Sequence, residues 1–377
     1  MPLNAAPQYD QGKVARPQHL PWIDWLRFLA AFMVLLVHVR GVSLPEYAAL
    51  PLDQQHPGYA ALYLLTRLRR EAVLLFFVLS GFLVGGRILD RVMNGSFRLG
   101  DYALDRMTRI YIPLVPALLL SGLVAGFTQA PADAALFCMN LLGLQGVWCG
   151  MFGANDPLWT LSFEIWFYAL GGALAWLVQT RRISFFVGAI LFVALAVFSK
   201  LGSSFLFCWL LGALAWRTRP DKFSPLACGI GILLVGIGTA VTQMNIETKM
   251  DTAASLRAWL PDQTIVRLVL ATGFGVVIQN LVVCAPARYS LASVDRWGAA
   301  LAACSYTLYL THYPVLVFLG HFGWKRADRI SLAALGSFVG AMACCFAAAW
   351  VLWFLFESRT GTVRNWVRSR LAGSAPA

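Results

Sequence analysis

Ten apolar runs, each close to the length that crosses a lipid bilayer, dominate this sequence of 377 residues. A hydrocarbon core about 30 Å thick needs roughly 20 mostly apolar residues per helix. Lipid offers no hydrogen bonds to the backbone, so such runs fold as helices. The expected fold is therefore all-α, a polytopic transmembrane bundle of about ten spans. The predicted spans are 22–41, 71–89, 110–129, 158–178, 183–199, 203–217, 223–242, 265–283, 299–321 and 330–356.

The composition supports a membrane protein and excludes several other classes. Only 13% of residues are charged and 59% are hydrophobic, whereas ordinary soluble domains carry roughly 25% charged residues. The net charge of +12 is typical of Lys and Arg retained in cytoplasmic loops. No basic run is interleaved with stacking aromatics, so no nucleic-acid partner is expected. The cysteines and histidines lack zinc-ligand spacing, so no metal is expected.

The distribution of basic residues predicts the topology. With the N-terminus inside, 18 of the 30 Lys and Arg residues fall on the inner side and 11 on the outer side, and Arg27 lies within a span. This bias places both termini in the cytoplasm. We expect a cytoplasmic polar tail over 1–20 without a signal peptide, a membrane domain over 21–358 and a cytoplasmic basic tail over 359–377. The short spans 183–199 and 203–217 are compatible with one broken hairpin.

The first span carries three ionisable residues, which are costly in lipid and usually face a bundle interior. Asp24 and Arg27 are three residues apart and can pair on one helix face. His38 follows Arg27 by 11 residues, which is three turns plus 20°, so both share one stripe about 16 Å apart along the axis. The alternative is that Asp24 and Arg27 are interfacial anchors and that His38 marks a helix end.

The fourth span carries a carboxylate among aromatic residues. Pro157 suits a helix start, and Glu164 follows about two turns inside, flanked by Trp159 and Tyr168. On the predicted topology Glu164 and His38 reach a similar depth in the outer half. A His–carboxylate pair is the arrangement of a general base. A helix-terminal carboxylate near an aromatic belt is the alternative.

Two inner motifs allow a binding role and a simpler structural one. Gly81 and Gly85 form a small-xxx-small face for helix packing, next to Ser80, whose hydroxyl can also satisfy a backbone carbonyl. Arg106 and Arg109 lie at the predicted inner start of the third span and share one side of a helix turn. They can grip phosphate oxygens bidentately or act as positive-inside anchors.

The ninth span places His312 in mid-helix, two residues before Pro314. A proline inside a helix frees carbonyl groups near it, and a single histidine beside it is often structural. Elsewhere, Cys138 and Cys149 share a predicted outer loop, where a disulfide is compatible with the sequence but not required by it.

Together these motifs resemble the integral-membrane acyltransferase family 3, which includes bacterial O-antigen acetylases and related sugar O-acyltransferases. The resemblance covers nearly the whole chain because the motifs occur in the family's order. They are 23–30 with His38, 76–82, 106–109, 158–168, 305–315 and 356–359.

The resemblance implies an acyl-CoA-dependent O-acyltransferase of a bacterial inner membrane. The donor would be acetyl-CoA, with no permanently bound cofactor. The acceptor would be the hydroxyl of a glycan or lipid-linked sugar on the outer side. Membrane lipid would be a partner, and a homo-oligomer is compatible with the sequence. The implied catalytic residues are His38 as general base, Glu164 as its support, Arg27 and Asp24. The implied acyl-CoA contacts are Arg106, Arg109, Arg87, Ser80 and Phe77. Further pocket candidates are Tyr168, Trp159 and His312.

Two other classes fit parts of the pattern. A transporter or flippase of lipid-linked glycans would use the same intramembrane charges as a proton relay. It would normally show related halves, and none is visible in the sequence. A structural subunit of a glycan-export complex would tolerate alanine at His38 and Glu164.

Overall fold

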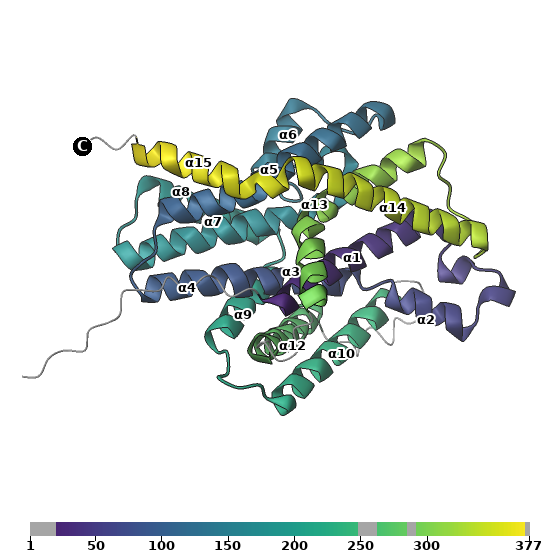
Figure 1. Cartoon of the computed structure of the whole chain (residues 1–377), viewed down its shortest axis with the longest axis horizontal. Coiled ribbons are helices and arrows are strands. Elements are labelled where there is room, and N and C mark those ends of the chain that lie inside the picture. The colour runs from purple at the N-terminus through teal and green to yellow at the C-terminus, as the bar shows by residue number, and fades with distance from the viewer. Residues whose placement is uncertain (1–19, 248–261, 285–291, 374–377) are drawn as a thin grey trace, which may run out of the picture.

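The computed structural model describes residues 20–247, 262–284 and 292–373, and these form a bundle of helices without a strand (Figure 1). The predicted N-terminal tail, apart from Leu20, lies outside the described residues. The α-helices are α1 (Pro21–Ser43), α2 (Pro57–Leu65), α3 (Arg69–Ser80), α4 (Gly86–Met93), α5 (Leu99–Thr128), α6 (Ala134–Leu141), α7 (Trp159–Thr180), α8 (Phe185–Lys200), α9 (Ser204–Arg217), α10 (Pro225–Glu247), α12 (Gln263–Cys284), α13 (Ala292–His321), α14 (Leu332–Leu355) and α15 (Thr360–Gly373). Short helical turns are η1 (Tyr47–Ala49), η2 (Leu52–Gln54), η3 (Gly81–Gly85), η4 (Phe152–Ala154), η5 (Asp156–Leu158) and η6 (Glu357–Arg359).

The described residues include eight helical segments long and apolar enough to cross a membrane. The expected multi-pass helical fold is therefore confirmed. The pair α8 and α9 is bent by 117° and passes the same test only when taken together, so the count is eight or nine rather than ten. The chain turns back between these two helices, as expected for a broken hairpin.

Two predicted helix boundaries differ from the structure. Helix α5 begins at Leu99, 11 residues before the predicted start, so Arg106 and Arg109 lie inside a helix and not at its beginning. The polar residues of its first turns are tolerated because they face a cavity and α15. The predicted basic tail is also helical from Thr360 to Gly373. Arg364 and Arg368 of α15 form ion pairs of 3.4 Å and 3.3 Å with Asp105 and Asp101 of α5, respectively.

Glycines allow α3, η3 and α4 to lie directly against α9. The π-helical turn η3 follows Ser80, and a Cβ atom added at Gly81 would overlap the carbonyl group of Trp209. In the other direction, a Cβ atom at Gly212 would overlap the carbonyl of Val78. The predicted packing role of Gly81 is confirmed, because only a hydrogen fits at this backbone contact.

We expect Gly81→Ala to lower the free energy of unfolding by about 1–3 kcal/mol, the usual cost of overpacking a close contact. Thermal unfolding in detergent should show a lower melting temperature. Gly126→Ala is the matched control, since nothing lies within 4 Å of a Cβ atom at Gly126 of α5. Equal melting temperatures for the two variants would contradict the packing role.

Pro314 in α13 has the expected effect on the backbone. Proline has no N–H group to donate to the carbonyl of Leu310. The side chain of Asn155 donates to that carbonyl instead, at 3.0 Å, and also donates to the hydroxyl of Ser121 at 3.1 Å. The proline thus ties α13 to α5 and to the loop before α7, because a freed carbonyl in a membrane needs another donor.

Candidate active site

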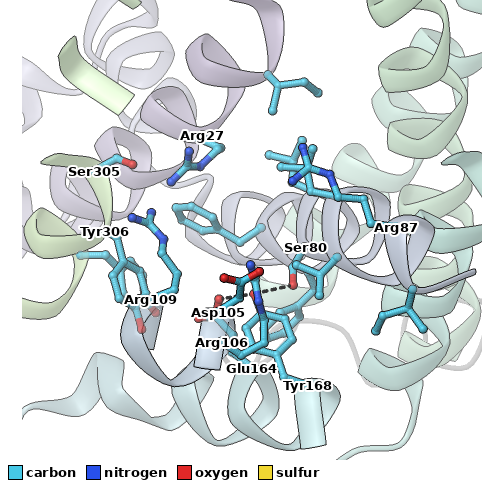
Figure 2. A pocket seen from close by; sticks show the side chains of 18 of the residues that line it. Arg27, Ser80, Arg87, Asp105, Arg106, Arg109, Glu164, Tyr168, Ser305 and Tyr306 are labelled. Atoms are coloured by element: carbon cyan, nitrogen blue, oxygen red, sulfur yellow. Dashed lines mark hydrogen bonds between the residues drawn. The ribbon is translucent and has the colours of Figure 1, made fainter. Parts of the chain in front are cut away.

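An inner cavity of about 500 Å³ lies among the predicted cytoplasmic ends of α1, α4 and α5 and the facing parts of α3, α7 and α13 (Figure 2). Arginine side chains from α1, α4 and α5 surround it. Most of the predicted site residues line this one cavity. They are Asp24, Arg27, Phe77, Ser80, Arg87, Arg106, Arg109, Glu164 and Tyr168.

A chain of hydrogen bonds crosses the wall of the inner cavity. The indole N–H of Trp209 donates to Ser80 Oγ at 3.2 Å, and the Ser80 hydroxyl donates to the Tyr168 oxygen at 3.1 Å. The Tyr168 hydroxyl in turn donates to Glu164 Oε1 at 2.7 Å. The guanidinium of Arg106 lies 5.5 Å from the centroid of the Tyr168 ring, within cation–π range. Glu164 therefore ends a fixed polar chain and faces the inner cavity.

Two of the cavity's arginines have carboxylate partners. Arg27 pairs with Asp24 at 3.9 Å, as the spacing on α1 predicted. Arg109 pairs with Glu357 at 2.6 Å, and the other Glu357 oxygen accepts from the backbone N–H and the hydroxyl of Thr307. The Glu357 side chain is only 2% exposed. Arg109 is thus part of a buried link between α5, α13 and η6.

The other three arginines of this cavity are available for an anionic ligand. Among the described ranges, no carboxylate lies within 4 Å of Arg87, Arg91 or Arg106, which line the inner cavity from α4 and α5. Guanidinium groups on neighbouring helix turns are suited to phosphate oxygens. The cavity therefore has a cationic rim at its predicted cytoplasmic side.

A second, outer cavity of about 370 Å³ contains His38. Its walls come from the predicted outer ends of α1, α3, α7 and α12 and from parts of α9, α10 and α13. The polar and aromatic residues that line it are His38, Arg69, Arg70, Asp156, Trp159, Phe205, Thr242, Gln263, Arg267 and Tyr309. Trp159, predicted as a pocket residue, belongs to this cavity.

The hydrogen bonds around His38 define its tautomer. His312 Nδ1 lies 3.0 Å from the carbonyl oxygen of Leu308, so this nitrogen carries a hydrogen and donates. His312 Nε2 is then the acceptor for His38 Nδ1, at 2.8 Å. These assignments follow from the partners of each ring nitrogen. The basic lone pair of His38 is therefore on Nε2, which accepts from the Arg69 guanidinium at 3.2 Å.

The structure does not bring Glu164 to His38. The predicted pair is replaced by His38–His312 in the outer cavity, and Glu164 bonds to Tyr168 in the inner cavity. The prediction placed the two groups at a similar depth, but the rotation of α7 about its axis decides which cavity Glu164 enters. His312, predicted as a pocket residue, is fully buried and lines neither of the two cavities. It takes the position beside His38 that was expected for the carboxylate.

Tyr309 and Val73 line both cavities and form the boundary between them. The Tyr309 hydroxyl bonds to Thr160 Oγ1 at 2.7 Å, and the Phe76 ring packs edge-on against the Tyr309 ring at 5.6 Å. The interior is therefore two adjoining cavities that share one aromatic wall, one with a cationic rim and the other lined by His38.

Several residues of the site were not selected from the sequence. Arg69 was counted only as an outer basic residue, although its position directly before the buried run of α3 is a usable signal. Arg91 lies four residues after Arg87, one helical turn away, and was likewise treated as an inner basic residue. Tyr309 lay inside the motif 305–315 but was given no role.

No group of three or more His, Cys, Asp or Glu within the described ranges has metal-binding geometry. Cys138 and Cys149 are both free thiols. Burial raises the pKa of the Cys149 thiol, and the Asn140 amide lies 3.8 Å from its sulfur.

The comparison with protein families agrees with this site. A family model described as an acyltransferase domain, Acyl_transf_3, matches residues 20–354. The chain belongs to acyltransferase family 3. The resemblance seen in the motifs is confirmed, and the protein is an integral, multi-pass membrane acyltransferase. No curated protein and no solved structure matches this acyltransferase.

Proposed function

We propose that this acyltransferase moves an acyl group, in the first place acetyl, from cytoplasmic acyl-CoA to a hydroxyl group of a glycan on the outer side of a bacterial cytoplasmic membrane. The observation that carries the proposal is the pair of adjoining cavities with different chemistry. The inner one has a rim of three arginines that have no carboxylate within 4 Å among the described residues, and the outer one holds His38, whose Nε2 lone pair accepts from Arg69.

The inner cavity suits the donor. Arg87, Arg91 and Arg106 would hold the phosphates of CoA, because planar guanidinium groups bind phosphate oxygens bidentately. The pantetheine arm carries amide groups, and Ser80, Tyr168 and Glu164 offer hydroxyl and carboxylate partners along the wall. Arg27, held by Asp24, would position the arm deeper in the cavity. Arg109 is assigned to the structural link with Glu357 rather than to phosphate binding.

The outer cavity suits the acceptor and the base. The acceptor oxygen attacks the thioester carbonyl carbon, the C–S bond breaks, and His38 Nε2 takes the hydroxyl proton. CoA leaves as a thiolate, which takes up one proton to give the free thiol, and the His38 imidazolium releases the proton taken from the acceptor, so the base is regenerated. His312 would hold His38 in the required tautomer, as a carboxylate does in a hydrolase triad. The acyl carbon must reach the boundary at Tyr309, where the two cavities adjoin.

The donor proposal is tested with the full-length protein in lipid nanodiscs, using acetyl-CoA and acetyl-pantetheine as alternative donors. Arg87→Gln combined with Arg106→Gln should raise the KM for acetyl-CoA by about tenfold or more, because charged hydrogen bonds contribute about 1.5–3 kcal/mol each. The KM for acetyl-pantetheine, which has no nucleotide phosphates, should change little. Release of CoA thiol and transfer of labelled acetyl give the rates.

Arg98→Gln is the matched control, since Arg98 is an exposed arginine at the start of α5 that does not line the cavity. An equal rise in KM for both donors would refute phosphate recognition by this rim. A purified protein that transfers no acetyl from acetyl-CoA to any glycan, while moving a lipid-linked glycan across the bilayer, would refute the proposed reaction.

A further inference from the structure

We propose that the outer cavity selects acceptors that carry an oxyanion, a carboxylate or a phosphate, and that this anion uncovers the base by drawing Arg69 away from His38. The inference rests on the proposed function, because it names the class of acceptor for the same site. It is carried by one contact and by the charge of the surrounding wall.

The contact is between Arg69 and the atom that the reaction needs. The Arg69 guanidinium donates to His38 Nε2 at 3.2 Å. This nitrogen holds the basic lone pair of the ring, since Nδ1 carries the hydrogen that is donated to His312. An acceptor hydroxyl cannot give its proton to a lone pair that is already engaged. Arg69 must therefore move before His38 can act as a base.

The charge of the wall indicates what moves Arg69. Three arginines, Arg69, Arg70 and Arg267, line the outer cavity together with one acidic residue, Asp156. None of the three has a carboxylate within 4 Å among the described residues. Asp156 accepts a hydrogen bond from the Tyr313 hydroxyl at 3.1 Å. The described lining of the cavity thus holds three arginines and one carboxylate, an excess of two positive charges.

Arg267 is held in place on this wall. Its guanidinium donates to the hydroxyl of the buried Ser204 at 2.9 Å and lies 4.6 Å from the centroid of the Phe205 ring. A guanidinium fixed by a hydroxyl and an aromatic face loses little freedom when it binds an anion. Arg267 is therefore a guanidinium held in a fixed position to bind the anion. The side chain of Arg69 is more exposed and can change position.

An oxyanion on the acceptor is a stronger partner for Arg69 than the imidazole. Guanidinium–carboxylate and guanidinium–phosphate bonds are charge-assisted and often bidentate, roughly twice as strong as a bond to a neutral acceptor. An acidic sugar would exchange the Arg69–His38 bond for a pair of Arg69–oxyanion bonds and leave Nε2 free. A neutral sugar offers no such exchange, so Arg69 stays bonded to His38 Nε2 and this nitrogen cannot accept the proton.

The experiment compares matched acceptors in nanodiscs of phosphatidylcholine with acetyl-CoA as donor. The probes are methyl glucuronoside, its methyl ester, methyl glucoside and methyl glucoside 6-phosphate. We expect kcat/KM for a charged probe to exceed that of the two neutral probes by about tenfold or more. Arg69→Gln should reduce this preference to about twofold or less, because the rate with the charged probe falls when its cationic partner is lost and the rate with the neutral probes rises when His38 Nε2 is no longer bonded to Arg69. Carboxylate and phosphate sources are distinguished by which charged probe is preferred.

Lys200→Gln is the control, because it removes one exposed positive charge at the end of α8 without touching the outer cavity. Equal acetylation of glucuronoside and its methyl ester by the wild type would overturn the proposal, as would an unchanged preference in Arg69→Gln. A dependence on phosphatidylglycerol in the disc, with no dependence on acceptor charge, would assign the arginines to lipid headgroups and would also overturn it.

Binding provides a readout that does not require turnover. Charged probes should raise the melting temperature of the wild type but not of Arg69→Gln combined with Arg267→Gln. If no charged probe shifts the wild-type melting temperature or is acetylated, anion selection is refuted. If charged probes bind selectively but acetyl-CoA releases no CoA with any acceptor, the proposed reaction fails while the anion site stands.

Discussion

His38→Gln is expected to lower the rate of acyl transfer by about 10²–10⁴-fold, the usual contribution of a general base. Glutamine keeps an N–H group that can donate to His312 Nε2, so the hydrogen bond now made by His38 Nδ1 at 2.8 Å can be retained. Glutamine has no basic nitrogen in place of His38 Nε2, so it cannot take the proton of the acceptor hydroxyl. The rate should be measured as transfer of labelled acetyl at saturating donor and acceptor, with the KM for acetyl-CoA unchanged.

His321→Gln is the matched control, because His321 is an exposed histidine at the end of α13 outside both cavities. The double variant His38→Gln/His312→Gln should be no slower than His38→Gln alone, since residues that act as one unit are not additive. Transfer by His38→Gln at the wild-type rate would remove the base assignment. Additive losses in the double variant would give His312 a separate role.

Glu357→Ala is expected to have the largest effect on stability. The Glu357 carboxylate accepts from Arg109 at 2.6 Å and from two groups of Thr307. Removing one partner of a buried pair typically costs 3–5 kcal/mol, because the remaining charge is left uncompensated. Arg109 is 34% exposed toward the cavity, so we expect the lower end, about 3 kcal/mol. Thermal and denaturant unfolding in detergent measure the loss.

Glu46→Ala provides the comparison for a surface pair. Glu46 bonds to Arg326 at 3.4 Å, but both side chains are exposed, and such pairs contribute about 0–1 kcal/mol. Glu357→Gln should fall between wild type and Glu357→Ala, since its amide oxygen can still accept from Thr307. A melting temperature for Glu357→Ala equal to that of Glu46→Ala would show that the link between α5, α13 and η6 does not stabilise the bundle.

Helix α1 contributes side chains to both cavities, whose chemistry differs. Arg27 and His38, which their spacing predicted on one stripe of α1, line the inner and the outer cavity respectively. Tyr309 and Val73 separate the two spaces. In the proposed reaction, the donor and the acceptor would approach this boundary from opposite sides of the membrane.

Much of the fold was predictable from local patterns. Long apolar runs mark membrane helices because lipid leaves the backbone no other hydrogen-bond partners. The close packing at Gly81 and the freed carbonyl near Pro314 also follow from the properties of single residues. The start of α5 was missed because its first turns are polar, and hydropathy does not reveal polar residues that face a cavity or another helix.

The sequence by itself determined that this chain is a helical membrane acyltransferase, and it selected Asp24, Arg27, His38 and Glu164 as ionisable groups within membrane spans. Only the tertiary structure decided which of them meet. His38 bonds to His312, Glu164 to Tyr168 and Arg109 to Glu357. The reason is that each helix is specified by its own sequence, whereas its rotation is set by packing against distant helices. Successive residues of an α-helix are 100° apart around the axis, so rotating a helix by this angle is enough to move a side chain to another face.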